Sequence, residues 1–72
     1  MKITQFKLFD TVAILNDMPS RKVVCGQVGT IVEILDKDHY EVEFTDKSGV
    51  TIAEFAVAAE NLMLLHYQAV SV

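Results

Sequence analysis

The sequence has few of the residues that small chains use to build covalent scaffolds or metal sites. Its 72 residues include no tryptophan, one proline, two histidines and one cysteine, Cys25. A single cysteine excludes an internal disulfide, which fits a protein of a reducing compartment. No Cys-x-x-Cys or His-x-x-x-His pair is present to supply two metal ligands locally, so we expect no metal and no cofactor.

Long apolar runs and basic residues are also scarce. No run approaches the ~20 apolar residues that cross a bilayer, and Lys2, Lys7 and Asp10 interrupt the first ten residues, unlike a secretion signal. Six basic residues against ten acidic ones give a net charge of −4, the opposite of what phosphate binding requires. We therefore expect a soluble cytoplasmic protein without a membrane partner, and nucleic acid is disfavoured as a partner.

The abundant residues are apolar and favour strands. Hydrophobic residues make up 51% of the chain, enough for one small domain over residues 1–72. The β-branched run from Asp10 to Leu15 predicts the first strand, and the turn-forming residues from Asn16 to Cys25 predict a long loop. Residues 1–9 form a lead-in segment. Three of its residues are expected to pack onto the body of the domain: Phe6, Leu8 and Phe9.

A second strand is predicted from Val28 to Leu35. Gly26 and Gly29 stand at its start, where glycine permits a positive φ, a bulge or a close approach of another backbone. The apolar residues of this strand do not alternate strictly. Either a bulge or burial on both faces explains the imperfect pattern.

The polar turn Asp36–His39 leads to a third strand, Tyr40–Phe44, with clean alternation. Its aromatic and valine side chains are expected to face the core, while Glu41 and Glu43 face water. The turn Asp46–Gly49 then predicts a hairpin, with glycine in the left-handed position. In the strand that follows, the expected inward set is Thr51, Ala53, Phe55 and Val57.

The end of the chain predicts a single helical turn at residues 58–61 and a short last strand at 62–65. The tail, residues 66–72, either adds an edge strand or frays. An uncovered C-terminal edge would be adhesive, so homo-oligomerisation there is compatible with the sequence. The residues that would form this edge are Leu64, Leu65, Tyr67 and Val70.

This order of elements resembles an SH3-like barrel, an all-β fold of about five antiparallel strands with one short helical turn before the last strand. The segments Asp10-Thr-Val, Gly26-Gln-Val-Gly-Thr-Ile, Tyr40-Glu-Val-Glu-Phe and Asn61-Leu-Met-Leu-Leu resemble a family of short bacterial proteins known only as a domain of unknown function. The resemblance covers nearly the whole chain. It implies the barrel and brings no activity, cofactor or catalytic residue.

A weaker resemblance is to KOW-type barrels, which contact RNA or protein. Gly29, Ile31 and Ile34 fill the positions of the glycine-led strand in such barrels, but Thr30 and Glu33 stand where an RNA binder carries lysine or arginine. SH3-like domains also serve as accessory parts of larger enzyme assemblies. The alternatives are therefore a KOW-like nucleic-acid-binding domain and a small accessory subunit of an enzyme complex.

Catalytic interpretations have little support. A reactive Cys25 would need a histidine, an orienting acid and a substrate pocket, for which an eight-kilodalton barrel rarely has room. A carboxylate pair of the glycosidase kind is far less common than a solvated strand face. Gly26-x-x-Gly29 lacks the Lys-Ser/Thr and helix of a phosphate loop. We expect no enzymatic activity.

The function that remains is binding. We expect a non-catalytic protein-interaction module, of the kind that acts as an accessory, inhibitory or antitoxin-like partner of another bacterial protein, because acidic proteins bind basic surfaces. Two groups of residues are candidates for contacting this protein, whose identity the sequence does not indicate. The long loop would contribute Met18, Pro19, Arg21 and Lys22, and the acidic strand face would contribute Glu33, Glu41 and Glu43.

Overall fold

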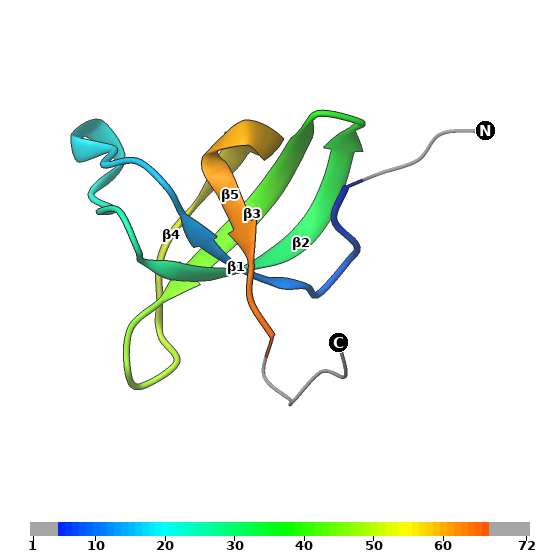
Figure 1. Cartoon of the computed structure of the whole chain (residues 1–72). Coiled ribbons are helices and arrows are strands. Elements are labelled where there is room, and N and C mark those ends of the chain that lie inside the picture. The colour runs from blue at the N-terminus through cyan, green and yellow to red at the C-terminus, as the bar shows by residue number, and fades with distance from the viewer. Residues whose placement is uncertain (1–4, 67–72) are drawn as a thin grey trace.

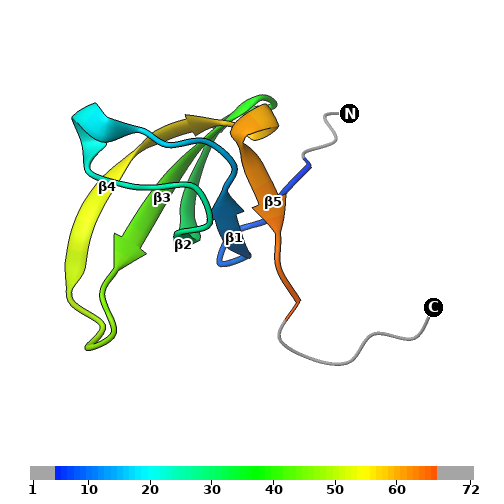
Figure 2. The same ribbon diagram turned by 60° about the vertical axis from the view of Figure 1, so that its left-hand side comes forward.

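The computed structural model of the chain describes residues 5–66. Five strands form one antiparallel sheet in the order β4-β3-β2-β1-β5. Their bounds are β1 Thr11–Ile14, β2 Val28–Asp36, β3 His39–Thr45, β4 Thr51–Ala58 and β5 Leu62–Leu64. Figures 1 and 2 show a twisted, curled sheet that stays open, with β4 and β5 as its two edges. The predicted all-β fold with five antiparallel strands is confirmed.

Helical structure in residues 5–66 is limited to two short 3-10 turns. The first, η1, spans Pro19–Arg21 inside the predicted long loop. The second, η2, spans Ala59–Asn61 directly before β5, which confirms the predicted helical turn. No helix in the part of the chain that the structure describes is long and apolar enough to cross a membrane.

The core lies on the concave inner face of the sheet. Tyr40, Val42 and Phe44 of β3 are fully buried there, as their alternation predicts. Phe44 stacks on Phe55 of β4 with ring centroids 5.3 Å apart. Burying these side chains supplies the main stabilising free energy of so small a domain. The remaining core residues are Phe6, Val12, Ile14, Val23, Ile31, Val57, Ala59 and Leu62.

The imperfect alternation of β2 comes from bulges. Val32 has no partner between the pairs Ile31↔Val42 and Glu33↔Glu41, and the register shifts again at Leu35. Each extra residue bends the strand and moves the following side chains relative to β3. Of the two explanations that the sequence leaves open, a bulge is therefore the observed one.

A third bulge, at Ile52, corrects the prediction for Thr51. Phe44 pairs with Ala53 but Thr45 pairs with Thr51, so Ile52 is the extra residue in β4. The Thr51 hydroxyl donates to the carboxylate of Glu43, which lies on the outer face of the sheet. Thr51 is exposed on that outer face, because the bulge reverses the alternation at this point. The other predicted inward residues of β4 do face the core.

The lead-in segment packs onto the sheet only in part. Phe6 is buried and its ring meets Tyr40 edge-on, with centroids 5.2 Å apart. Leu8 and Phe9, however, are 49% and 75% exposed, so the prediction that they pack onto the body is wrong. The Phe9 N–H donates to the carbonyl of Ile31 with Phe9 at a φ of 71°, a turn that directs its side chain away from the core.

The predicted C-terminal edge is described only at its beginning. Leu64 is partly exposed on β5, and the N–H of Leu65 donates to the carbonyl of Thr11, which extends the contact with β1. Tyr67 and Val70, and most of the predicted tail, lie outside the described residues. The proposed homo-oligomer through this edge therefore stays a prediction.

Candidate functional site

Four glutamates lie together on the outer face of β2, β3 and β4. Glu33 pairs directly with Glu41 across β2 and β3, and Glu43 pairs directly with Glu54 across β3 and β4. In an antiparallel sheet, directly opposite side chains share a face, and alternate residues of one strand share it as well. We call Glu33, Glu41, Glu43 and Glu54 the acidic face.

The acidic face is electrostatically unfavourable for the fold. Like charges directly opposite one another destabilise a sheet, and here two such pairs are neighbours. Among the described residues no lysine or arginine forms an ion pair with these glutamates, since the one ion pair found there joins His39 to Asp36. Within residues 5–66 the four carboxylates of the acidic face therefore lack a lysine or arginine ion-pair partner.

Glu41 is at the centre of this arrangement. Burial raises the pKa of its carboxyl above the ordinary value, and the approaching Glu54 carboxyl and the charge of Glu33 raise it further. The positive charge of Arg21 acts in the opposite direction and is the smallest of these effects. Glu41 is thus the acidic-face carboxylate whose negative charge most clearly lowers the stability of the fold.

The structure brings together the three glutamates that the sequence proposes and adds Glu54. Alternation with Phe55 and Val57 puts Glu54 on the outer side of its strand, but its place opposite Glu43 depends on the Ile52 bulge. Without that extra residue the register at Thr45↔Thr51 would place Ala53 opposite Glu43. Nothing in the sequence around Glu54 indicates that it lies opposite Glu43.

The loop residues proposed for binding have separate roles. Met18 is partly buried against the core and forms a bridge with Val23, so it serves the fold as well as any surface. Pro19 is exposed at the start of η1, where a missing N–H costs nothing. Lys22 is exposed in the left-handed conformation with a φ of 63°.

Arg21 is the loop residue that packs against β4, and it does so on the core side of the sheet, where the Phe55 ring lies. Its guanidinium carbon lies 5.0 Å from the ring centroid of Phe55, in the geometry of a cation–π contact. η1 lies beside β4 in both views of the ribbon (Figures 1 and 2). Among the described residues, none of these four loop residues forms a hydrogen bond or ion pair with the acidic face.

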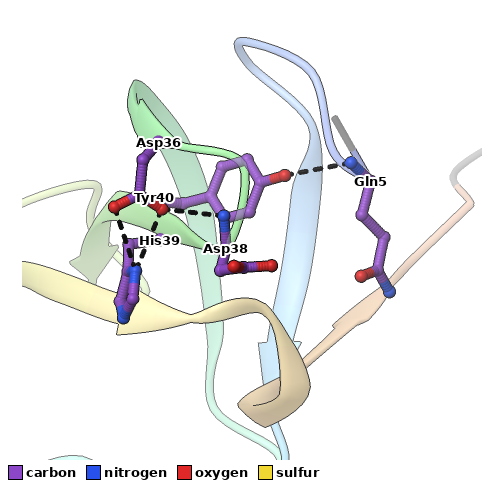
Figure 3. Close-up of polar contacts among 5 residues, drawn as sticks. All are labelled: Gln5, Asp36, Asp38, His39 and Tyr40. Atoms are coloured by element: carbon purple, nitrogen blue, oxygen red, sulfur yellow. Dashed lines mark hydrogen bonds and ion pairs between the residues drawn. The ribbon is translucent and has the colours of Figure 1, made fainter. Parts of the chain in front are cut away.

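A second polar cluster lies at the β2–β3 turn (Figure 3). Nδ1 of His39 is 3.0 Å from an Asp36 carboxylate oxygen, which also accepts the N–H of Asp38 at 2.8 Å. The Asp38 N–H, and next the His39 side chain, hold the pKa of Asp36 below its ordinary value. His39 is the first residue of β3, whereas the sequence predicts it in the turn.

This cluster borders a half-open hollow of about 400 Å³. The hollow is lined by Gln5, Asp38, His39, Ala58, Ala59 and Glu60. A histidine oriented by a carboxylate is a component of acid–base sites, yet both side chains are half exposed. Exposure of this kind gives water free access, which does not favour catalysis.

The thiol of Cys25 is not part of that cluster. It lies 3.2 Å from the carbonyl oxygen of Leu15, to which it donates, and its backbone N–H donates to Asp17 at 2.8 Å. Within residues 5–66 no group of three or more histidine, cysteine, aspartate and glutamate side chains is arranged to hold a metal ion.

The family of the chain follows from its sequence. A family model described as "Domain of unknown function (DUF4926)" matches residues 8–64, so the chain belongs to this family. The match confirms the predicted membership of a family known only as a domain of unknown function, and its description names no activity. No curated protein and no solved structure matches the chain.

Proposed function

We propose that this DUF4926 domain is a non-catalytic protein-interaction module that binds a basic surface of another protein inside the bacterial cytoplasm. The observation that carries the proposal is the acidic face, with its two directly opposed glutamate pairs and no basic partner among the described residues. A charge cluster that destabilises the free domain is relieved when a partner supplies the opposite charge.

The same observation disfavours the nucleic-acid alternative. Phosphate contacts need lysine and arginine, whereas this face consists of carboxylates and the whole chain carries a net charge of −4. A basic protein surface is complementary in charge and gains from the lowered dielectric of an interface. Accessory, inhibitory and antitoxin-like roles all fit this mode of binding, because each covers the surface of another protein.

Affinity capture from a lysate of the source cell, followed by titration of the captured protein, tests the proposal. The double variant Glu33→Gln/Glu41→Gln removes two charges from the acidic face, which changes the net charge of the chain from −4 to −2. Asp38→Asn/Glu60→Gln makes the same change of net charge at the hollow. We expect one stoichiometric protein whose affinity falls about tenfold or more with the first variant and changes little with the second.

Salt provides a second measurement of the same interaction. Binding through the acidic face should weaken as ionic strength rises, since exposed charges are screened beyond about 8 Å at physiological salt. Equal binding by both double variants would contradict the proposal. Capture of RNA in place of a protein would support the KOW-like alternative.

A further inference from the structure

The outer side of β4 is an open sheet edge. β4 pairs only with β3, and within residues 5–66 no backbone hydrogen bond reaches its other side. The N–H of Ala59 donates to the carbonyl of Asp38 at 2.8 Å, which sets the phase of the ladder. Since bonded residues alternate along an antiparallel pair, Phe55 bonds toward β3. Glu54 and Ala56 therefore direct their N–H and C=O groups away from the sheet.

This edge lacks most of the devices that keep edges from pairing. Natural edge strands are protected by lysine, proline, bulges or short length. β4 is eight residues long and contains neither lysine nor proline, and its bulge at Ile52 affects only its beginning. From Ala53 to Ala58 the register is regular and Glu54 is the single charged residue.

We propose that the open edge of β4 binds an extended basic segment of the partner protein as an added strand, with lysine or arginine at alternate positions. This inference rests on the proposed function and specifies how the acidic face would be used. Main-chain hydrogen bonds to Glu54 and Ala56 would supply affinity, and alternate side chains would supply specificity.

The positions of the glutamates determine the expected sequence of the segment. A basic residue directly opposite Glu54 would pair with its carboxylate on the outer face. A basic residue opposite Ala56 would extend past that small side chain toward Glu41, which is the β3 partner of Ala56. Two strand spacings separate an added strand from β3 by about 10 Å, which a lysine and a glutamate side chain together span.

Charge also selects against a second copy of the chain as the occupant. Two β4 edges paired antiparallel around their centres would bring Glu54 close to Glu54 of the other copy. Like charges at this spacing oppose association, and each copy would add a further acidic face. A basic segment removes the repulsion that a second copy would increase.

The test uses capped synthetic peptides of alternating valine and lysine, titrated against the full chain by isothermal calorimetry. A second peptide has the same sequence but carries N-methyl groups on every other residue. This peptide keeps all its charges but loses the backbone N–H donors along one of its two edges. A third has the same composition with its lysines grouped together. We expect the N-methylated and the grouped peptides each to bind about tenfold or more weakly than the alternating peptide.

A protein variant tests the edge from the other side. Ala56→Pro removes an N–H that points away from β3, a place where sheets tolerate proline, and Ala56→Ser is the matched control. Ala56→Pro should lose about tenfold in affinity for the alternating peptide, and Ala56→Ser should bind like the original chain. If Ala56→Pro fails to fold, the comparison of the three peptides on the original chain still tests whether a strand is added at β4.

The outcomes separate this inference from the proposed function. Equal, salt-sensitive binding of the alternating and N-methylated peptides would overturn the added strand and leave an acidic binding face intact. Absence of binding by all three peptides would also overturn the added strand, while the capture experiment decides the proposed function independently. The inference would be supported if the N-methylated peptide fails to bind while the alternating peptide still binds the Ala56→Ser variant.

Discussion

Gly29 shows how one residue without a side chain allows β2 and β3 to approach. A Cβ built on Gly29 would lie 2.7 Å from Cγ1 of Val42 and 2.9 Å from the backbone oxygen of Glu43. We expect Gly29→Ala to lower the free energy of unfolding by about 1–3 kcal/mol, because the buried surroundings must shift. Urea unfolding measures the change.

Gly26→Ala separates crowding from backbone strain. Gly26 has a φ of 91° and open space around its Cα, so alanine there suffers only the unfavourable conformation. We expect a loss of about 1–2 kcal/mol at this position. Adding Val42→Ala makes room only at Gly29, so it should reduce the cost of Gly29→Ala and leave that of Gly26→Ala unchanged. A cost of Gly29→Ala that is independent of Val42 would contradict crowding by the Val42 side chain and leave the Glu43 oxygen and the Phe44 ring, each 2.9 Å from the added Cβ, as its cause.

Glu41 should make stability depend on pH in a defined direction. The pKa of its carboxyl is raised in the fold above the ordinary value of 4.5 that it has in the unfolded chain. The folded chain therefore binds the carboxyl proton more tightly than the unfolded chain does. The contribution of Glu41 to stability therefore improves as pH falls through the folded pKa toward 4.5, and is least favourable at neutral pH. Glu41→Gln should raise the free energy of unfolding at pH 7 by about 0.2–1 kcal/mol.

The difference between the original chain and Glu41→Gln isolates this group from the other titrating residues. The gain from the substitution should shrink as pH falls toward 4.5. Glu60→Gln on η2, away from the acidic face, should not gain stability at pH 7. A gain from Glu41→Gln that is equal at both pH values would show that charge is not the cause.

At the scale of elements, Tyr40 connects the lead-in segment to the sheet. Its hydroxyl oxygen accepts the backbone N–H groups of Gln5 and Phe6 at 3.0 and 3.2 Å. The bond from Phe6 is buried, so Tyr40→Phe leaves an N–H without its partner. We expect a loss of about 1–3 kcal/mol in the free energy of unfolding.

Amide hydrogen exchange locates that effect. Tyr40→Phe should speed exchange at Gln5 and Phe6 more than at the central strands, because the segment would open locally. Phe9→Ala is the control, since Phe9 is 75% exposed. It should change stability by no more than about 0.5 kcal/mol. Unchanged exchange at Phe6 in Tyr40→Phe would contradict the anchoring role.

The sequence predicted most elements because their signals are local. Strict alternation in Tyr40–Phe44 and the turn residues of Asp46–Gly49 specify a strand and a hairpin without tertiary information. Gly49 has the expected left-handed conformation, with a φ of 84°. Elements of this kind could be placed to within a residue or two.

Register could not be predicted, because it depends on bulges. One extra residue, Ile52, turns Thr51 outward and places Glu54 opposite Glu43. Another, Leu35, sets the register in which Glu33 meets Glu41. Bulges are selected by the packing of whole strands. The imperfect alternation of Val28–Leu35 allows a bulge without locating it, and nothing local marks the bulge at Ile52. The acidic face was therefore visible in the sequence as separate glutamates but not as opposed pairs.

At the scale of the whole molecule, Glu54 has a second role in keeping copies of the chain apart. It is the single charged residue in the regular part of the open edge. Removing a charge from such an edge leaves its unpaired backbone groups and apolar side chains open to another copy. The acidic face would then favour binding of a basic partner and oppose self-association through the same edge.

Glu54→Val tests this role. The substitution keeps a residue suited to strands and removes the central negative charge, so we expect concentration-dependent self-association at pH 7. Light scattering coupled to size exclusion should show a higher mean mass for Glu54→Val than for the original chain at equal concentration. Glu60→Val removes one charge outside β4 and should leave the mass unchanged. Association of both variants would assign the effect to net charge, and association of neither would show that the edge is closed by another feature.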